Sequence, residues 1–258
     1  MKTDNPCEAK MEPFDSFWEA PDDIERGFKK FAKFYQRNYF RHLQVGPTDR
    51  VLVVSCGPGY FLKTLEQNGI SNILGIDSDP AKINYAKKKN LNAKEAKATE
   101  YLKSNNNKYD VIVLEQEINH LTKDGVLSFL SLCHRNLNVG GRLVVHSLNG
   151  ANPITGAEAL AQNFDHFNTF TEYSLSQILE YCDFHVAHIF PLNLYIFYEN
   201  PLNYAGLFVD TLLQGLFRLL FVFYGKHNRL FSKKIGAIGI KKSANLGHFT
   251  SSVTHILG

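Results

Sequence analysis

The sequence predicts an α/β fold: a doubly wound, mostly parallel sheet with helices on both faces and a helical insertion near the C-terminus. Short apolar, β-branched runs recur along residues 45–190, stretches with helical periodicity separate them, and a loop containing glycine follows the first run. At 258 residues, of which 44% are hydrophobic and 21% charged, the chain can bury one sizeable core. One domain with insertions is therefore expected.

Six segments have the composition of strands. Most of them lack polar alternation, which is typical of parallel strands that are covered on both faces. The segments are residues 51–54 (VLVV), 72–77 (NILGID), 109–115 (YDVIVLE), 141–147 (GRLVVHS), and stretches near 184–190 and 235–241. The last two would complete the sheet on either side of an insertion at about residues 200–226.

Apolar residues at three- and four-residue spacing predict helices between the strands. The helical segments are residues 59–68, 79–89, 123–137 and 174–182. The second begins with Asp79 and Pro80, a helix cap followed by proline at the first helical position. The run LNVGG predicts a glycine turn into the strand at 141–147.

The rest of the chain is divided as follows. Residues 1–44 are expected to form a helical region, whose aromatic and basic stretch at 22–43 lies over the ligand crevice as a lid. Residues 45–242 form the main domain. Residues 243–258 have the composition of a loose tail.

The longest apolar region, residues 204–225, is interrupted by Asp210, Gln214 and Arg218. A membrane-spanning helix needs roughly 20 residues that are nearly all apolar, so this segment is not expected to cross a bilayer. Its apolar residues are spaced for a helix buried against the protein, which is the favoured interpretation. Peripheral contact with a membrane surface is the alternative.

Charge and cysteine content narrow the classes of function. The 28 basic and 25 acidic residues leave a net charge of +3, and the lysines are spread along the chain, so no nucleic-acid partner is expected. None of the four cysteines has C-x-x-C spacing, and the polar start lacks the apolar core of a signal peptide. These features predict a reduced, cytoplasmic protein without a metal, and they leave its oligomeric state open.

The loop after the first strand reads SCGPGYF. A dinucleotide site needs G-x-G-x-x-G, so that backbone amides and a helix N-terminus can receive a pyrophosphate. Only Gly57 and Gly59 are present, and a bulky residue occupies the third position. NAD is therefore disfavoured. Asp77, at the end of the second strand, is a carboxylate that can accept both ribose hydroxyls of a nucleoside.

Four segments, VLVVSCGPGYFLKTL, ILGIDSDPAKINYAKK, YDVIVLEQEINHL and LNVGGRLVVHSLNG, resemble those of class I methyltransferases, which use S-adenosylmethionine (SAM). The resemblance covers about residues 45–190 and implies a Rossmann-like sheet of seven strands with SAM as the cofactor. FDSFWE and DHFNTFT are similar to segments of methyltransferases associated with bacterial surface-polysaccharide biosynthesis. This implies O-methylation of a sugar hydroxyl in a surface glycan or its precursor. The alternatives are another small-molecule acceptor and a degenerate, non-catalytic SAM-binding module.

The resemblance also assigns roles to residues. The loop would wrap the methionine end of SAM, Asp77 would hold the ribose and Ser78 would border the adenine. The cofactor-binding residues expected are Ser55, Cys56, Gly57, Pro58, Gly59, Asp77, Ser78, Ala98, Gln116 and Tyr35. For Tyr35, filling the core is the favoured alternative to covering the cofactor.

Three positions depart from the family pattern. Val53 stands where an acid usually helps to fix the amino end of the cofactor, and Lys97 stands where an acid usually meets the adenine amino group. Ser55 replaces a customary glycine. Val53 would complete a buried apolar strand with or without a ligand. One of the residues 115–117 (Glu-Gln-Glu), after the strand at 109–115, could compensate for the lost acid.

Methyl transfer to a hydroxyl requires a base, and two histidines are candidates. His166, in DHFNTFT, is the first because histidine side chains can exchange protons near neutral pH and its polar, aromatic loop follows the strand at 141–147, where acceptors enter. His120, in INHL, is the second, although a histidine at the start of a helix more often makes a packing hydrogen bond. His146, within a strand, is interpreted as structural.

Overall fold

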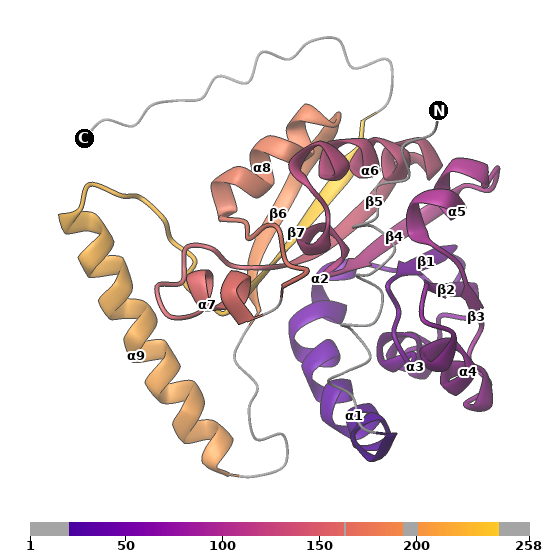
Figure 1. The fold of residues 1–258 in the computed structure, drawn as a ribbon, viewed down its shortest axis with the longest axis horizontal. Helices are drawn as coiled ribbons and strands as arrows, with labels where there is room; N and C mark the ends of the chain where they lie inside the picture. The colour runs from indigo at the N-terminus through magenta and orange to yellow at the C-terminus, as the bar shows by residue number, and fades with distance from the viewer. Residues whose placement is uncertain (1–20, 163, 193–200, 243–258) are drawn as a thin grey trace.

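The computed structural model describes residues 21–162, 164–192 and 201–242. Within them, seven strands form one sheet in the order β3-β2-β1-β4-β5-β7-β6 (Figure 1). The strands are β1 Val51–Val54, β2 Ile73–Asp77, β3 Ala93–Glu95, β4 Tyr109–Glu115, β5 Leu137–Leu148, β6 Phe184–Leu192 and β7 Lys234–Lys241. Only β7 is antiparallel to its neighbours, β5 and β6. The predicted doubly wound, mostly parallel sheet is confirmed.

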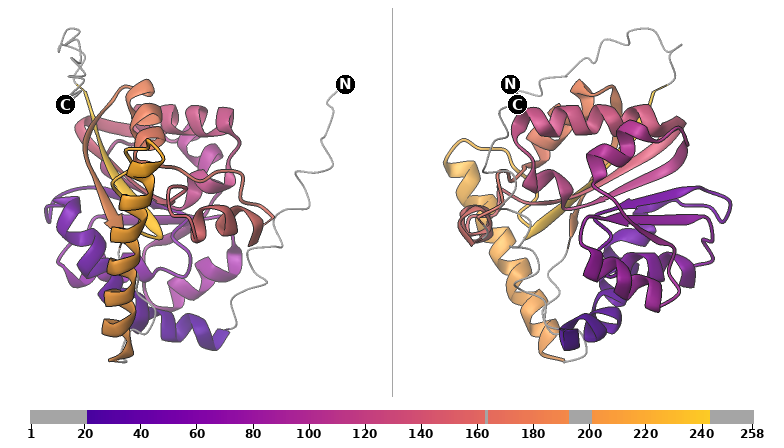
Figure 2. Two further views of the ribbon diagram at one scale, coloured as in Figure 1. Left: turned by 90° about the vertical axis from the view of Figure 1, so that its left-hand side faces the viewer. Right: turned by 45° about the vertical axis from the view of Figure 1, so that its right-hand side comes forward.

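Helices cover both faces of the sheet (Figure 2). They are α1 Pro21–Phe34, the π-helical η3 Tyr35–Phe40, α2 Arg41–Leu43, α3 Tyr60–Gln67, α4 Pro80–Lys88, α5 Ala98–Ser104, the 3₁₀-helical η4 Glu117–His120, α6 Lys123–Asn136, α7 Thr155–Gln162, α8 Glu172–Tyr181 and α9 Leu202–Phe223. One core cluster contains Phe61 of α3 and Ile83 of α4. The other contains Phe129 of α6 and Leu179 of α8. Each face of the sheet therefore has its own apolar layer.

All six predicted strands are present. The seventh, β3, has three residues, which is too short for its pattern to stand out in the sequence. β5 begins at Leu137, so the expected glycine turn lies inside the strand, where Gly140 has a φ of 75°. The pairing of β4 with β5 shifts register between Tyr109 and Val111. A bulge of this kind absorbs extra residues without ending the strand, because glycine tolerates the left-handed backbone.

The strand order places a ligand crevice at one edge of the sheet. The chain runs outward from β1 through β2 to β3 and then crosses to β4 on the other side of β1. Such a reversal is a topological switch point, and ligands of doubly wound sheets bind outside the carboxyl ends of the strands there. The residues that follow β1, β2 and β4 therefore share this edge.

The helix predicted at 22–43 is present as α1, η3 and α2. The ring centroids of Phe28 and Phe31 in α1 lie 4.9 and 5.1 Å from that of Tyr60, the first residue of α3. Glu25 Oε1 forms an ion pair with Lys89 Nζ beside α4 at 2.7 Å. α1 thus lies next to the start of α3, directly after the glycine loop. Its role as a lid stays a prediction, and the FDSFWE segment and the tail at 243–258 lie outside the described residues.

α9 contradicts the expectation that residues 204–225 are buried against the protein. Its most apolar window is only 6% buried. Figures 1 and 2 show the helix on the outer side of the molecule. Among the described residues, α9 alone is long and apolar enough to cross a membrane by length and composition. Helical periodicity predicted the element correctly. It does not determine whether another element covers the apolar face, because that depends on the tertiary arrangement.

Candidate cofactor and acceptor site

The loop between β1 and α3 turns through left-handed backbone conformations. Ser55, Gly57 and Gly59 have φ values of 56°, 54° and 95°. A Cβ atom at position 59 would lie 2.4 Å from Cδ1 of Leu91, so glycine is required there. A Cβ atom at position 57 would meet no atom within 4 Å, which leaves space for a ligand to approach the backbone closely.

Ser55 adopts the left-handed conformation although it has a side chain. Its Oγ donates a hydrogen bond to the carboxylate of Glu117 in η4. A left-handed backbone costs a non-glycine residue roughly 1–2 kcal/mol, and the hydrogen bond to a charged acceptor offsets part of that cost. The contact also joins the glycine loop to the segment after β4, so Glu117 is the acid that the structure places against this loop.

Asp77 faces the same loop from the end of β2. Its Oδ2 accepts the Gly57 N–H at 2.8 Å, and its Oδ1 accepts the Asp79 N–H at 2.9 Å. Burial raises the pKa of Asp77, and the two backbone hydrogen bonds act against that rise. Each carboxylate oxygen can accept more than one hydrogen bond. Asp77 can therefore hold the loop and still accept ribose hydroxyls.

Asp77→Ala is expected to weaken SAM binding by roughly 2 to 4 kcal/mol, because it removes the charged acceptor of two hydroxyls and releases the Gly57 N–H. Titration calorimetry of the purified protein with SAM measures this change. Asp124→Ala, an exposed carboxylate in α6, is the control and should bind as the wild type does. Unchanged affinity in Asp77→Ala would place the cofactor elsewhere.

The other residues expected at the cofactor lie at the same edge in different environments. Cys56 and Pro58 are buried, so they present backbone to the crevice, and burial raises the pKa of the Cys56 thiol. Ser78 is exposed directly after β2. Gln116 follows β4 with a φ of 63°. Ala98 begins α5, just after Ala96, whose N–H donates to the carbonyl of Asp77 at 2.9 Å.

Val53 and Lys97 are both explained without a ligand. Val53 is 0% exposed and belongs to the core cluster on one face of the sheet, where it pairs with Gly75 and Val113 on the neighbouring strands. Lys97 is exposed and immediately precedes α5. The side chain of Val53 therefore completes the core.

Glu115 lies on the face of β4 that packs against η3. The hydroxyl of Tyr35 donates to Glu115 Oε2 at 2.9 Å, and Nδ1 of His146 lies 3.6 Å from the same oxygen. Burial raises the pKa of Glu115, and the surrounding His146, Tyr35 and Tyr39 outweigh this effect, so the pKa is lowered. Tyr35 and Tyr39 are 8% and 0% exposed. Both tyrosines thus belong to the core cluster on this face, and Tyr35 also donates to Glu115 at the end of β4.

His146, which is 3% exposed, makes stability depend on pH. Burial lowers its pKa below the ordinary 6.5. As the pH falls, His146 takes up a proton in the unfolded chain at a higher pH than in the folded protein. The folded state therefore keeps its full stability above pH 6.5 and loses stability as the pH falls from there toward the folded-state pKa. We expect the free energy of unfolding to decrease between about pH 7.5 and pH 5.5, and to decrease less in His146→Gln.

Urea unfolding at the two pH values measures the difference. His185→Gln, an exposed histidine in β6, is the control and should keep the slope of the wild type. An unchanged slope in His146→Gln would contradict the prediction.

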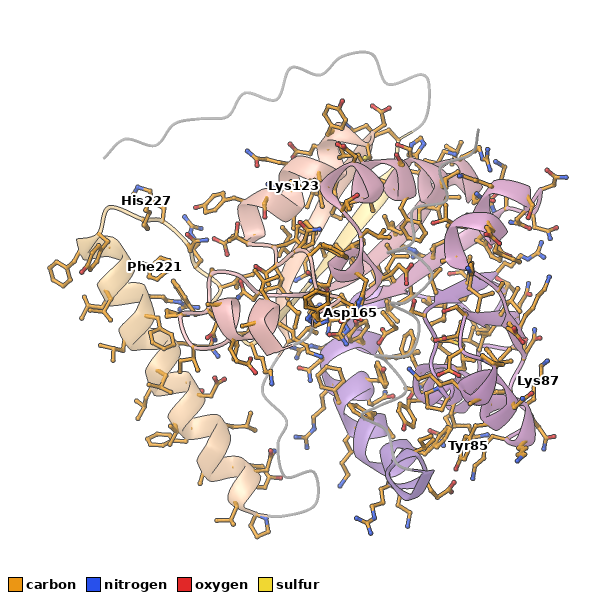
Figure 3. The ribbon with its side chains drawn as sticks, viewed as in Figure 1. Tyr85, Lys87, Lys123, Asp165, Phe221 and His227 are labelled. Atoms are coloured by element: carbon orange, nitrogen blue, oxygen red, sulfur yellow. The ribbon has the colours of Figure 1, made fainter. Side chains whose placement is uncertain are left out.

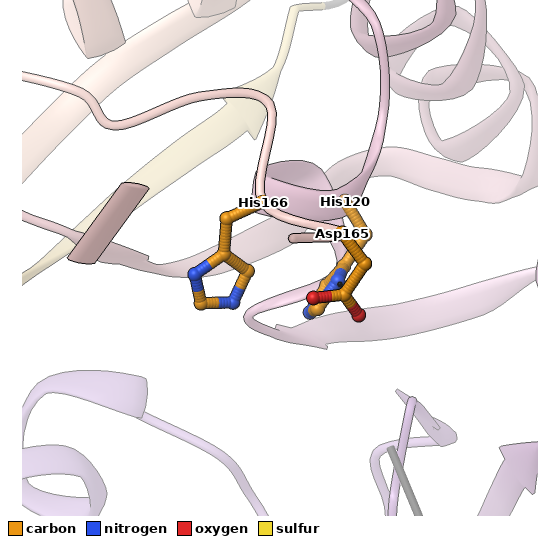
Figure 4. A group of neighbouring side chains, drawn as sticks. All are labelled: His120, Asp165 and His166. Carbon is orange, nitrogen blue, oxygen red and sulfur yellow. Dashed lines mark ion pairs between the residues drawn. The ribbon is translucent and has the colours of Figure 1, made fainter. Parts of the chain in front are cut away.

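His120 and His166, the two candidate bases, lie together with Asp165 (Figure 4). Nδ1 of His120 is 3.0 Å from Asp165 Oδ2, and the two imidazole centroids are 4.7 Å apart. Nδ1 of His166 is 2.7 Å from the carbonyl oxygen of Ala159. Since a carbonyl only accepts, Nδ1 of His166 carries the hydrogen and Nε2 is the basic nitrogen.

Asn119 brings the two histidines together. Its backbone carbonyl accepts the N–H groups of Phe167 and Asn168 at 2.8 and 3.2 Å. Its side-chain Nδ2 donates to the carbonyl of Asn168 at 2.7 Å, across 49 residues of sequence. η4 is therefore fixed against the loop that carries His166. The sequence holds no local signal for this pairing, and Asn119 was not predicted as a site residue.

Two imidazoles and a carboxylate are also donors that suit a divalent cation. Ligand atoms of His120, Asp165 and His166 lie within 4.8 Å of one another. The spacing of the cysteines predicts no metal. The donors of this group are histidine and aspartate side chains from two separate segments, which cysteine spacing does not reveal. The absence of a metal stays a prediction.

Fold and site together define a doubly wound α/β protein with a glycine loop and a carboxylate at the switch point of the sheet, and with a histidine pair on the segments after β4 and β5. Residues 24–189 match the family model described as a methyltransferase domain. The chain belongs to this methyltransferase family. No curated protein matches the chain significantly.

Solved structures agree with this fold. A SAM-dependent methyltransferase from Archaeoglobus fulgidus has a TM-score of 0.57 and 20% identity, covering 92% of this chain and 100% of that chain. A chain of the complex between the Haloferax volcanii Trm112 methyltransferase activator and a methyltransferase has a TM-score of 0.63 and 13% identity, covering 91% and 98%.

A third similar structure is geranyl diphosphate C-methyltransferase from Streptomyces coelicolor with S-adenosyl-L-homocysteine, with a TM-score of 0.53 and 15% identity, covering 81% of this chain and 76% of that chain. The Rossmann-like methyltransferase fold is thereby confirmed. These findings are consistent with SAM as the cofactor. The open backbone at Gly57 and the carboxylate of Asp77 fit it.

Proposed function

We propose that this chain is a SAM-dependent O-methyltransferase that methylates a sugar hydroxyl in a bacterial surface glycan or its precursor. The observation that carries the proposal is the pair of His120 and His166 beside Asp165, on the segments after β4 and β5. A hydroxyl acceptor must lose a proton during methylation, and a histidine can take it. The glycan assignment is supported by the similarity of DHFNTFT to segments of polysaccharide-associated methyltransferases.

The residues of the chain divide the work between two sides of the crevice. When bound, SAM supplies a methyl group that needs no further activation. The glycine loop and Asp77 would hold it, with Glu117 in place of the acid that is missing at Val53. His166 would accept the proton of the hydroxyl at Nε2, and the carbonyl of Ala159 holds the ring in that tautomer. His120, oriented by Asp165, is the alternative base.

Aromatic side chains next to the histidines suit a sugar acceptor. Phe164 and Phe167 are 81% and 48% exposed on either side of Asp165 and His166. Ligand sites are commonly lined by aromatic rings with a few polar groups that fix orientation. Carboxylate, imidazole and aromatic groups in one loop would contact both the hydroxyls and the apolar face of a sugar ring.

A transfer assay tests the proposal. The purified protein is incubated with methyl-labelled SAM and a panel of nucleotide sugars, bacterial oligosaccharides and non-sugar hydroxyl and carboxyl acceptors. We expect label in an alkali-stable methyl ether on a sugar. Transfer only to a non-sugar acceptor would overturn the glycan assignment and keep the methyltransferase.

A second candidate is a non-catalytic SAM-binding module. It is favoured by the buried Val53, which occupies the position of the acid that usually helps to fix the amino end of the cofactor. Titration calorimetry with SAM and S-adenosyl-L-homocysteine separates the candidates. Heat of binding together with transfer supports the enzyme, whereas binding without transfer to any acceptor supports the module. The absence of binding would overturn both.

A further inference from the structure

We propose that α9 lies flat on an anionic membrane surface and holds the domain there. The helix lies on the outer left side of the molecule in Figure 1, and it runs in front of the other elements in the left view of Figure 2, where that side faces the viewer. Most of its apolar side chains are exposed, and its most apolar window is 6% buried. This inference does not depend on the acceptor proposed above.

The exposed apolar residues share one side of the helix. Residues three and four positions apart face the same way. Those with this spacing are Phe208, Leu212, Leu216, Leu219 and Phe223, with exposures of 64%, 58%, 48%, 55% and 78%. The stripe is widened by Tyr204, Val209, Leu220 and Val222. We call this set the α9 apolar face.

The charged residues of α9 lie outside its apolar face. Asp210 Oδ2 accepts a hydrogen bond from Gln214 Nε2 at 2.7 Å, and burial raises the pKa of Asp210. Arg218 Nε donates to the carbonyl of Arg229 at 2.8 Å. A long apolar face with its charges displaced to the other side is the pattern of helices that lie in a membrane interface.

The opposite side of α9 is attached to the domain. The rings of Phe217 and Phe221 pack on Phe231 with centroid distances of 6.1 and 4.6 Å, and Phe231 is 0% exposed (Figure 3 labels Phe221). Ala151 belongs to the same small cluster. This attachment fixes the rotation of the helix, so its apolar face points away from the protein.

The connection from α9 to β7 disfavours an orientation that spans the membrane. With 22 residues α9 is long enough, since at 1.5 Å per residue it extends for about 33 Å, against a hydrocarbon core of about 30 Å. However, residues 225–233 return from the end of α9 to β7 without helix or strand. Irregular backbone exposed to lipid does not occur in the hydrocarbon region. A bilayer contact from the side of α9 leaves this connection in water.

Charge selects an anionic lipid surface over a second copy of this chain. Residues 211–258 contain seven of the 28 lysines and arginines and none of the 25 aspartates and glutamates. Lys226, Arg229 and Lys233 are exposed directly after α9. Anionic lipids attract such residues, whereas two α9 faces packed in parallel would bring the same positive charges together.

Flotation of the full chain with lipid vesicles tests the proposal. We expect it to bind vesicles of phosphatidylcholine with about 30% phosphatidylglycerol, to bind pure phosphatidylcholine at least about tenfold more weakly, and to lose affinity as salt rises. The double variant Leu212→Glu and Leu219→Glu should weaken binding at least about tenfold, because it places charge in the α9 apolar face.

The control is Tyr181→Glu, which places the same charge on a 76% exposed aromatic residue of α8 and should bind vesicles as the wild type does. Circular dichroism checks that the variants fold, which we expect because the substituted side chains are exposed. Failure of the wild type to float with anionic vesicles overturns the proposal. So does a dimer in analytical ultracentrifugation that the double variant dissolves while vesicle binding stays unchanged.

Discussion

His166→Ala is expected to lower turnover at least about a hundredfold while it leaves the affinity for SAM within a factor of about two. General-base catalysis typically contributes about 10²- to 10⁴-fold, and a secondary sugar hydroxyl does not ionise at neutral pH without a base. The cofactor contacts belong to other segments, since Asp77 and Gly57 are bonded to each other at the ends of β2 and β1. Loss of the imidazole should therefore affect transfer alone.

Two further variants separate a base from a packing residue. His166→Asn can still donate to the carbonyl of Ala159 from the position of Nδ1 but cannot take a proton, so it should be as inactive as His166→Ala. His120→Ala should reduce turnover less. Equal losses of SAM affinity and turnover would mean that the loop is structural, and full activity in His166→Ala would move the base to His120 or Glu117.

Val53→Asp is expected to destabilise the protein by about 3 to 5 kcal/mol, because the site is completely buried and a carboxylate there would lose its hydration. Glu115, on the same face of the sheet, adds a second carboxylate nearby. The acid that is usual in the family is therefore incompatible with this core. Urea unfolding monitored by circular dichroism measures the loss.

Val53→Thr has nearly the same shape and only one hydroxyl, so it serves as the control and should cost about 1 to 2 kcal/mol. A Val53→Asp protein as stable as the wild type, with tighter SAM binding, would show instead that the side chain faces the cofactor.

The cofactor side and the acceptor side of the site differ in how much of each the sequence predicts. The glycine loop and Asp77 were identified from the sequence because turn glycines and a carboxylate at a strand end are local features. The sequence alone does not tell whether Val53 faces the core or the cofactor. All four residues of β1 are apolar, so their pattern does not distinguish the two faces of the strand. The pairing of β1 with β2 and β4 decides it.

The acceptor side was only half predicted. His120 and His166 were selected by residue type, but their proximity depends on Asn119, which bonds to Asn168 across 49 residues of sequence. The hydrogen bond from Tyr35 to Glu115 spans 80 residues. Contacts over such distances depend on the order of strands in the sheet, which no local pattern specifies.

The sequence by itself determined the α/β class, six of the seven strands and the glycine loop, because hydrophobic periodicity, helix caps and glycine requirements act within a few residues. Only the tertiary structure decided that the α9 apolar face is exposed, that Glu117 supports Ser55, and that two histidines share an aspartate. An apolar side chain has the same preference for burial wherever it occurs, and only the packing of distant elements decides which of these preferences the fold satisfies.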